Sequence, residues 1–147
     1  MIGRFLRIAI VIPAVAAVPL SAQQRAPSDS ARLQGHWTMV SGSAGGYPMP
    51  PEMLSTMKRF AAGNEVTITM NEAVYFKATF KLNSAGTPRA IDYQMTAGPT
   101  AGSAQLGIYE ISGDTVRFSF ASPGKPRPQN FDAGGDRTVS VWVKVRP

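Results

Sequence analysis

Cysteine is absent from the 147-residue sequence, and histidine occurs once, at His36. The absence of cysteine excludes disulfide bonds, thiol nucleophiles and thiolate metal ligands, so the hydrophobic core alone must hold the fold together. With one histidine, Cys–His catalysis is excluded and a Ser–His–Asp triad is disfavoured. No cluster of His, Asp or Glu accompanies His36 in the sequence, so we expect neither a bound metal nor a cofactor.

Long hydrophobic runs are confined to the N-terminus. Arg4 and Arg7 precede an uncharged apolar run from Ile8 to Leu20, and the small pair Ser21-Ala22 follows it. This layout is typical of a secretory signal peptide. It predicts that residues 1–22 are removed and that the protein is exported to the periplasm or the exterior. The run is shorter than the ~20 residues that span a bilayer, which disfavours an uncleaved anchor, and we expect no integral membrane segment after cleavage.

Positive charge is in moderate excess. The formal net charge is +6 at pH 7, and loss of Arg4 and Arg7 would lower it to +4. The remaining cations are scattered and form no basic stripe with interleaved aromatic residues, so we expect no nucleic-acid partner. Residues 23–32 are polar and are expected to form a flexible lead. Residues 33–147 are long enough for one domain with a sizeable core.

Alternation of apolar and polar residues with a period of two is the main pattern after residue 33. It is clearest over Val66–Met70, Phe76–Leu82, Thr115–Phe120 and Arg137–Arg146. Short turn signals such as Ser112-Gly113-Asp114 separate these segments, which is typical of hairpins. About seven or eight strands at this spacing predict an all-β sandwich or barrel, and periodicity alone does not separate the two.

One short helix is expected near the start of the domain. Pro50-Pro51-Glu52 has the proline and the acid that suit a first helical turn. Met53, Leu54, Met57 and Phe60 then recur at helical spacing, and Gly63 ends the unit. We expect this apolar side to pack on the barrel as a plug or lid.

Trp37 follows Gly35 at the start of the first expected strand, and this Gly-x-Trp pattern is similar to the lipocalin signature. A larger set of segments resembles a bacterial family of small secreted β-domains, the planctomycete-type family. These segments are Leu33-Gln34-Gly35, Phe76–Leu82, Pro88–Asp92, Leu106–Glu110, Gly113–Thr115 and Pro123–Pro128.

The resemblance implies a lipocalin-like, antiparallel up-and-down barrel of about eight strands. In lipocalins the tryptophan closes one end of the barrel, and a basic residue of the last strand packs against it. The resemblance therefore implies that Lys144 or Arg146 contacts Trp37. His36 would then point to solvent, because neighbouring side chains of a strand face opposite ways. The family has no established activity, so the resemblance implies an architecture and no reaction.

Two carboxylates, Asp92 and Glu110, lie within expected strands rather than in turns or at helix caps. An acid on an apolar strand face is costly unless it is paired. Arg89, Arg117 or Arg127 would suit a structural ion pair. The alternative is a polar anchor at the bottom or mouth of a ligand cavity. No catalytic constellation accompanies the two acids, so we do not expect an enzyme.

Lys125 and Arg127 stand between prolines in the segment Pro123–Pro128. Proline restricts the backbone, so the two cations are held at low entropic cost. This arrangement predicts an anion clamp at the mouth of the barrel, and the alternative is a stiff loop with solvated charges.

Three classes of function stay open from the sequence, and an enzyme is the least favoured of them because so few acid–base residues are present. The first is an exported carrier or sensor that binds a small apolar or amphipathic molecule, such as a fatty acid or an aromatic acid. The second is a structural or protein-interaction domain of the cell envelope. In that domain the barrel interior would be filled by Phe76, Phe80, Phe118 and Phe120.

Overall fold

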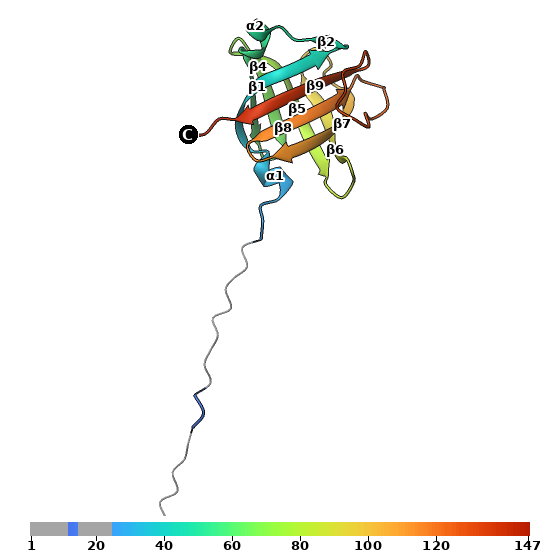
Figure 1. Cartoon of the computed structure of the whole chain (residues 1–147). Coiled ribbons are helices and arrows are strands. Elements are labelled where there is room, and N and C mark those ends of the chain that lie inside the picture. The colour runs from blue at the N-terminus through green and yellow to red at the C-terminus, as the bar shows by residue number, and fades with distance from the viewer. Residues whose placement is uncertain (1–11, 15–24) are drawn as a thin grey trace, which may run out of the picture.

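Eight antiparallel strands close into a β-barrel in the computed structural model, which describes residues 12–14 and 25–147 (Figure 1). The strands are β1 (Gly35–Ala44), β3 (Met57–Ala62), β4 (Glu65–Met70), β5 (Ala73–Asn83), β6 (Arg89–Ala97), β7 (Ala104–Ser112), β8 (Thr115–Ala121) and β9 (Arg137–Lys144). Each pairs with the next, and β9 closes the barrel by pairing with β1. The predicted up-and-down barrel is confirmed. Most of the predicted signal peptide lies outside the described residues.

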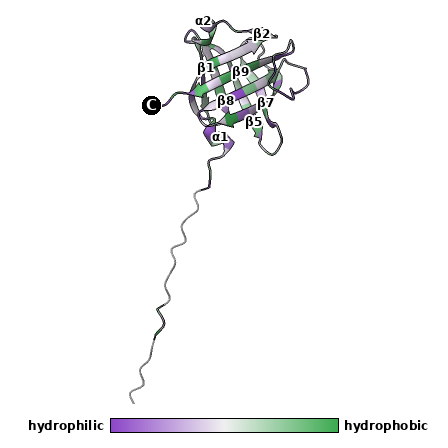
Figure 2. Cartoon of the chain, in the orientation of Figure 1, coloured by the Kyte–Doolittle hydropathy of each residue, from purple (hydrophilic) through white to green (hydrophobic). Residues whose placement is uncertain are grey.

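Short elements cover the two ends of the barrel. Helix α1 (Asp29–Arg32) lies at one end, while strand β2 (Tyr47–Pro48) and helix α2 (Pro51–Leu54) lie at the other (Figure 1). The polar sequence of α1 stands out as hydrophilic in Figure 2. Residues 29–32 were expected in a flexible lead. They form a helix instead, because Ser28 caps it and Asp29 and Arg32 bond to the barrel.

Two-residue turns join four of the hairpins. They are Gly45-Gly46, Gly63-Asn64, Asn71-Glu72 and Gly113-Asp114, each between strands paired up to the turn. Asn71 and Glu72 both have positive φ, at 50° and 66°, which is the conformation of a type I′ turn. This turn matches the right-handed twist of the flanking strands, so it fixes the register in which the inward faces meet.

The apolar side of three predicted strands, over residues 66–70, 76–82 and 115–120, faces the interior. Exposed fractions are at most 4% for Val66, Ile68, Ala78, Phe80, Val116 and Phe118. In β9, Ser140 and Trp142 are buried, whereas Val143 of the alternate face is exposed. Buried and less buried positions alternate in β3 and β4, as the period-two pattern predicts, whereas β7 and β8 also bury the neighbouring pairs Ile108–Tyr109 and Phe118–Ser119.

The helix predicted beyond Leu54 is wrong. Helix α2 ends there, and residues 57–62 form strand β3, which is hydrogen-bonded to β1 on one side and β4 on the other. Met57 is buried in the core, whereas Phe60 points outward and stacks on His36 at 4.5 Å between ring centres. A short apolar run fits the period of a helix and the period of a strand equally well. Here the hydrogen bonds to β1 and β4 on both edges favour the strand.

The Gly-x-Trp pattern has the structural role that the resemblance implies. Gly35 has φ of 91°, a conformation that favours glycine. Trp37 is 1% exposed, and the Lys144 ammonium lies 5.2 Å from its ring centre. Arg146 pairs with Asp114 instead. His36 is exposed, as predicted.

Candidate functional site

The four side chains proposed from the sequence as a ligand site do not come together. Asp92 Oδ1 lies 2.6 Å from Arg127 Nη1, an ion pair whose angles fall outside hydrogen-bond geometry. Glu110 Oε2 accepts a hydrogen bond from Arg117 Nη2 at 2.8 Å. Lys125 is exposed. Asp92 and Glu110 therefore each form an ion pair with an arginine, which was the alternative to a ligand anchor. A ligand role for the four residues stays a prediction.

The proline-rich loop packs along the outside of the barrel. Arg127 Nη1 donates to the carbonyl oxygen of Gly107 at 2.8 Å and contacts that of Ile91 at 3.4 Å. Farther along the loop, the Phe131 ring lies 4.0 Å from the guanidinium of Arg117. These contacts tie the loop to β6, β7 and β8, so Arg127 serves to hold it there.

A cavity of about 220 Å³ occupies the barrel interior. Its mouth lies at the end opposite α1, where Ala44, Tyr75, Thr100, Gln105 and Thr138 lie near strand ends. Its walls are mainly apolar and include Met39, Met57, Ile68, Met95, Phe118 and Trp142. The interior aromatic residues therefore fill only part of the barrel, and space for a small molecule remains.

Arg59 is the charged residue in this cavity wall. Its side chain enters the barrel from β3, and the residue is only 1% exposed. Nη1 donates to the Leu33 carbonyl oxygen at 3.1 Å, and the guanidinium carbon lies 5.1 Å from the centre of the Phe118 ring. Nε and Nη2 are buried without a hydrogen-bond partner among the described residues.

The charge of Arg59 is not neutralised in the described part of the chain. The described residues that line the cavity include no Asp or Glu, and no ion pair to Arg59 is formed within residues 25–147. Burial of an unpaired charge costs free energy, which one carbonyl and one aromatic face offset only in part. A buried polar group left in this state is a feature of functional sites.

Tyr93 lies beside Arg59 in the cavity wall and stays protonated. Burial raises the pKa of the Tyr93 phenol, and the nearby positive charge of Arg59 lowers it by less. A phenolate is therefore not the counter-ion of Arg59. The neutral hydroxyl keeps a donor proton, which an anionic ligand can accept.

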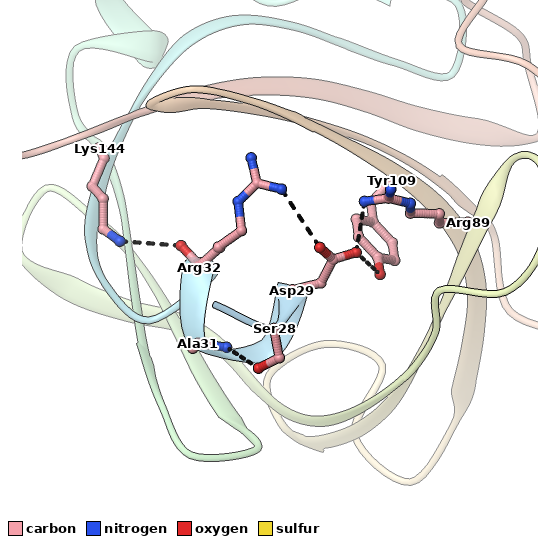
Figure 3. Close-up of polar contacts among 7 residues, drawn as sticks. All are labelled: Ser28, Asp29, Ala31, Arg32, Arg89, Tyr109 and Lys144. Carbon is pink, nitrogen blue, oxygen red and sulfur yellow. Dashed lines mark hydrogen bonds and ion pairs between the residues drawn. The ribbon is translucent and has the colours of Figure 1, made fainter. Parts of the chain in front are cut away.

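Helix α1 lies across the opposite end of the barrel (Figure 3), and Leu33, which follows the helix, is fully buried. Asp29 Oδ2 accepts hydrogen bonds from the Tyr109 hydroxyl and from Arg89 Nη1, both at 2.8 Å. Lys144 Nζ donates to the Arg32 carbonyl oxygen at 3.1 Å. Burial, followed by the hydrogen bond and charge of Asp29, raises the pKa of Tyr109. Arg59, which is bonded to the Leu33 carbonyl oxygen, thus lies at the end of the cavity nearer to α1.

Sequence reasoning missed Arg59 because residues 53–60 were interpreted as one helix. The signal that places it inside is the period-two set Met57, Arg59 and Ala61, which alternates with Lys58 and Phe60. If residues 57–62 are assigned to a strand, Arg59 lies between two inward apolar residues. That position identifies it as a buried charge.

Two further properties concern the described residues alone. In residues 12–14 and 25–147, no three His, Asp or Glu side chains gather as a metal site. Across the same ranges, no helix has the length and apolar character to cross a membrane.

Comparisons with protein-family models, curated proteins and solved structures found no match, so the function is inferred from the geometry of the cavity.

Proposed function

We propose that this barrel binds a small amphipathic molecule in its interior. The observation that carries the proposal is a cavity of about 220 Å³ with apolar walls and one buried, unpaired guanidinium. An apolar cavity of roughly 150 Å³ holds benzene, and pockets for drug-sized molecules start at about 300 Å³. The cavity therefore suits a ligand of one aromatic ring with a short chain, or an aliphatic chain of similar volume.

Burial of the apolar part of such a ligand supplies the driving force. Each methylene group that leaves water contributes about 0.8 kcal/mol. Four methionines line the cavity, at positions 39, 49, 57 and 95. Their flexible, polarisable side chains adapt to ligands of different shape. We therefore expect the cavity to select ligands by their volume and polarity more than by their exact shape.

The second candidate is a structural domain without a ligand. It is supported by the aromatic packing inside the barrel, where the rings of Tyr93 and Phe120 are 4.1 Å apart and those of Phe118 and Phe120 are 5.7 Å apart. These contacts stabilise the interior whether or not a ligand is present. The unpaired charge of Arg59 has no role in this alternative, which is why we favour binding.

Export remains part of the proposal and rests on Arg4, Arg7 and the apolar run from Ile8 to Leu20. N-terminal sequencing of the protein recovered from its native cell should begin at Gln23. Recovery of intact Met1 from the cytoplasm would contradict export and would leave the binding proposal unaffected.

The binding proposal is tested by titration with 4-phenylbutyrate, followed by the fluorescence of Trp142 in the cavity wall. The variant Ile68→Phe places extra volume in the cavity and should abolish the change. Val74→Phe adds the same ring at an exposed position that does not line the cavity, so it should bind like the wild type. Binding that survives Ile68→Phe, or no binding by any small amphiphile, would refute a site in the interior.

A further inference from the structure

One edge of the buried Arg59 guanidinium has no hydrogen-bond partner among the described residues. Of its three nitrogens, Nη1 is bonded to the Leu33 carbonyl, whereas Nε and Nη2 have no partner among the described residues. Nε and Nη2 carry parallel N–H groups on the same edge of the planar group. This edge matches the two oxygens of a carboxylate, which it can bind through two hydrogen bonds at once.

We infer that the ligand is an organic monocarboxylate whose head group binds the Nε–Nη2 edge of Arg59, an inference that rests on the proposed interior site. The carboxylate supplies the counter-charge that the cavity lacks. It also satisfies both unpartnered donors, and a buried charge pair is favourable only when its remaining hydrogen bonds are made. The rest of the ligand lies among the apolar walls and extends toward the mouth.

Tyr93 adds a second contact for the same head group. Its phenol lines the cavity beside Arg59 and is protonated, since burial raises its pKa. The hydroxyl can donate a hydrogen bond to a carboxylate oxygen that Arg59 leaves free. We therefore assign Tyr93 as a binding residue that favours an acceptor head group over a donor.

The charge available in the cavity favours a singly charged head group. Arg59 is the only cation that lines the cavity in the described part of the chain. Lys125 and Arg127 do not line it, and Arg127 is already paired with Asp92. A phosphate monoester carries close to two negative charges at neutral pH, one of which would be buried without compensation. A planar monocarboxylate avoids that cost.

Three probes of one shape test the head group on the wild-type protein: 4-phenylbutyrate, 4-phenylbutan-1-ol and 4-phenylbutylamine, measured by calorimetry. The acid should bind about tenfold to a hundredfold more tightly than the alcohol, as expected for charge-assisted hydrogen bonds. The amine should not bind. Equal affinity of the acid and the alcohol would overturn the inference but leave the interior site standing. If no probe binds, the proposed function fails as well.

Variants of Arg59 provide the second arm. Arg59→Met removes the charge and Arg59→Lys removes the two-pronged edge, so both should lose the preference for the acid. Arg59→Met should keep binding of the alcohol, which shows that the cavity is intact. Lys58→Met changes the adjacent cation on the outer face and should bind all three probes like the wild type.

Direct contact is read from the NMR signal of the Arg59 Nε–H group. A bidentate carboxylate should move this signal to lower field when the acid is added and leave it unmoved with the alcohol. An unmoved signal at saturating acid would place the head group elsewhere and overturn the inference, even if Arg59→Met weakened binding through folding.

Discussion

Trp37 and Arg59 donate hydrogen bonds to the same acceptor, the carbonyl oxygen of Leu33, each at 3.1 Å. Leu33 ends helix α1 and is fully buried. The Leu33 carbonyl thus holds both the indole of Trp37 and the guanidinium of Arg59 in place. This shared acceptor holds Nη1 of Arg59 and leaves Nε and Nη2 without a hydrogen-bond partner among the described residues.

Trp37→Ala should destabilise the protein by about 3–5 kcal/mol, because it removes a large buried side chain and leaves a cavity. His36→Ala should cost less than about 1 kcal/mol, since His36 is exposed and contacts Phe60 on the outer face. Urea unfolding of the two variants measures both values. A larger effect for His36→Ala would mean that the facing of β1 is inverted.

Arg59→Met should leave the stability of the ligand-free protein unchanged or raise it by about 1–3 kcal/mol. The substitution replaces a buried, unpaired charge by an apolar chain of similar length. The Leu33 carbonyl keeps the hydrogen bond from Trp37. Chemical denaturation measures the change. A loss of stability above about 3 kcal/mol would show that Arg59 serves the fold and not a ligand.

Asp29→Ala should destabilise the protein by about 1–3 kcal/mol, because the buried hydroxyl of Tyr109 and the Arg89 guanidinium lose their acceptor. The matched control is Glu110→Ala. That substitution removes one member of an exposed ion pair with Arg117 and should cost less than about 1 kcal/mol. Thermal and urea unfolding of both variants are the measurements, and equal costs would contradict the closing role of α1.

Stability should fall as the pH rises above about 10. The pKa values of Tyr93 and Tyr109 are raised in the folded protein, so the unfolded chain loses these protons first. The stability is complete below the ordinary tyrosine pKa, and the decline is up to about 1.4 kcal/mol per pH unit for each tyrosine. Tyr109→Phe should therefore reduce the slope between pH 10 and 11, measured by urea unfolding. An unchanged slope in this variant would contradict the raised pKa of Tyr109.

The barrel is predictable from the sequence because each strand carries its own period-two pattern and each hairpin its own turn signal. The burial of Trp37 was expected from the resemblance of Gly35-x-Trp37 to the lipocalin signature, and Gly35 has the positive φ that glycine favours. Residues 57–60 were misassigned because Met57 and Phe60 also fit a helical period. Only hydrogen-bond pairing with β1 and β4, which the local pattern does not contain, decides that segment.

The candidate site depends on that misassigned segment, which is why it could not be predicted. Asp92 and Arg127 were correctly identified as polar groups in need of partners, and they partner each other. The sequence does not show which of several cations has no partner, because that property depends on three-dimensional neighbours. Arg59 became a candidate only once its burial and its two free donors were known.

A crystal structure of the protein with 4-phenylbutyrate tests the interior site most directly. We expect the carboxylate within hydrogen-bond distance of Arg59 Nε and Nη2, with the phenyl ring between Met57 and Phe120 in the cavity wall. Crystals of the double variant Lys125→Ala/Arg127→Ala with 4-phenylbutyrate should show the acid at the same position in the barrel interior. Density for the acid at the proline-rich loop, with an empty interior, would contradict the Arg59 site and support the clamp first predicted from the sequence.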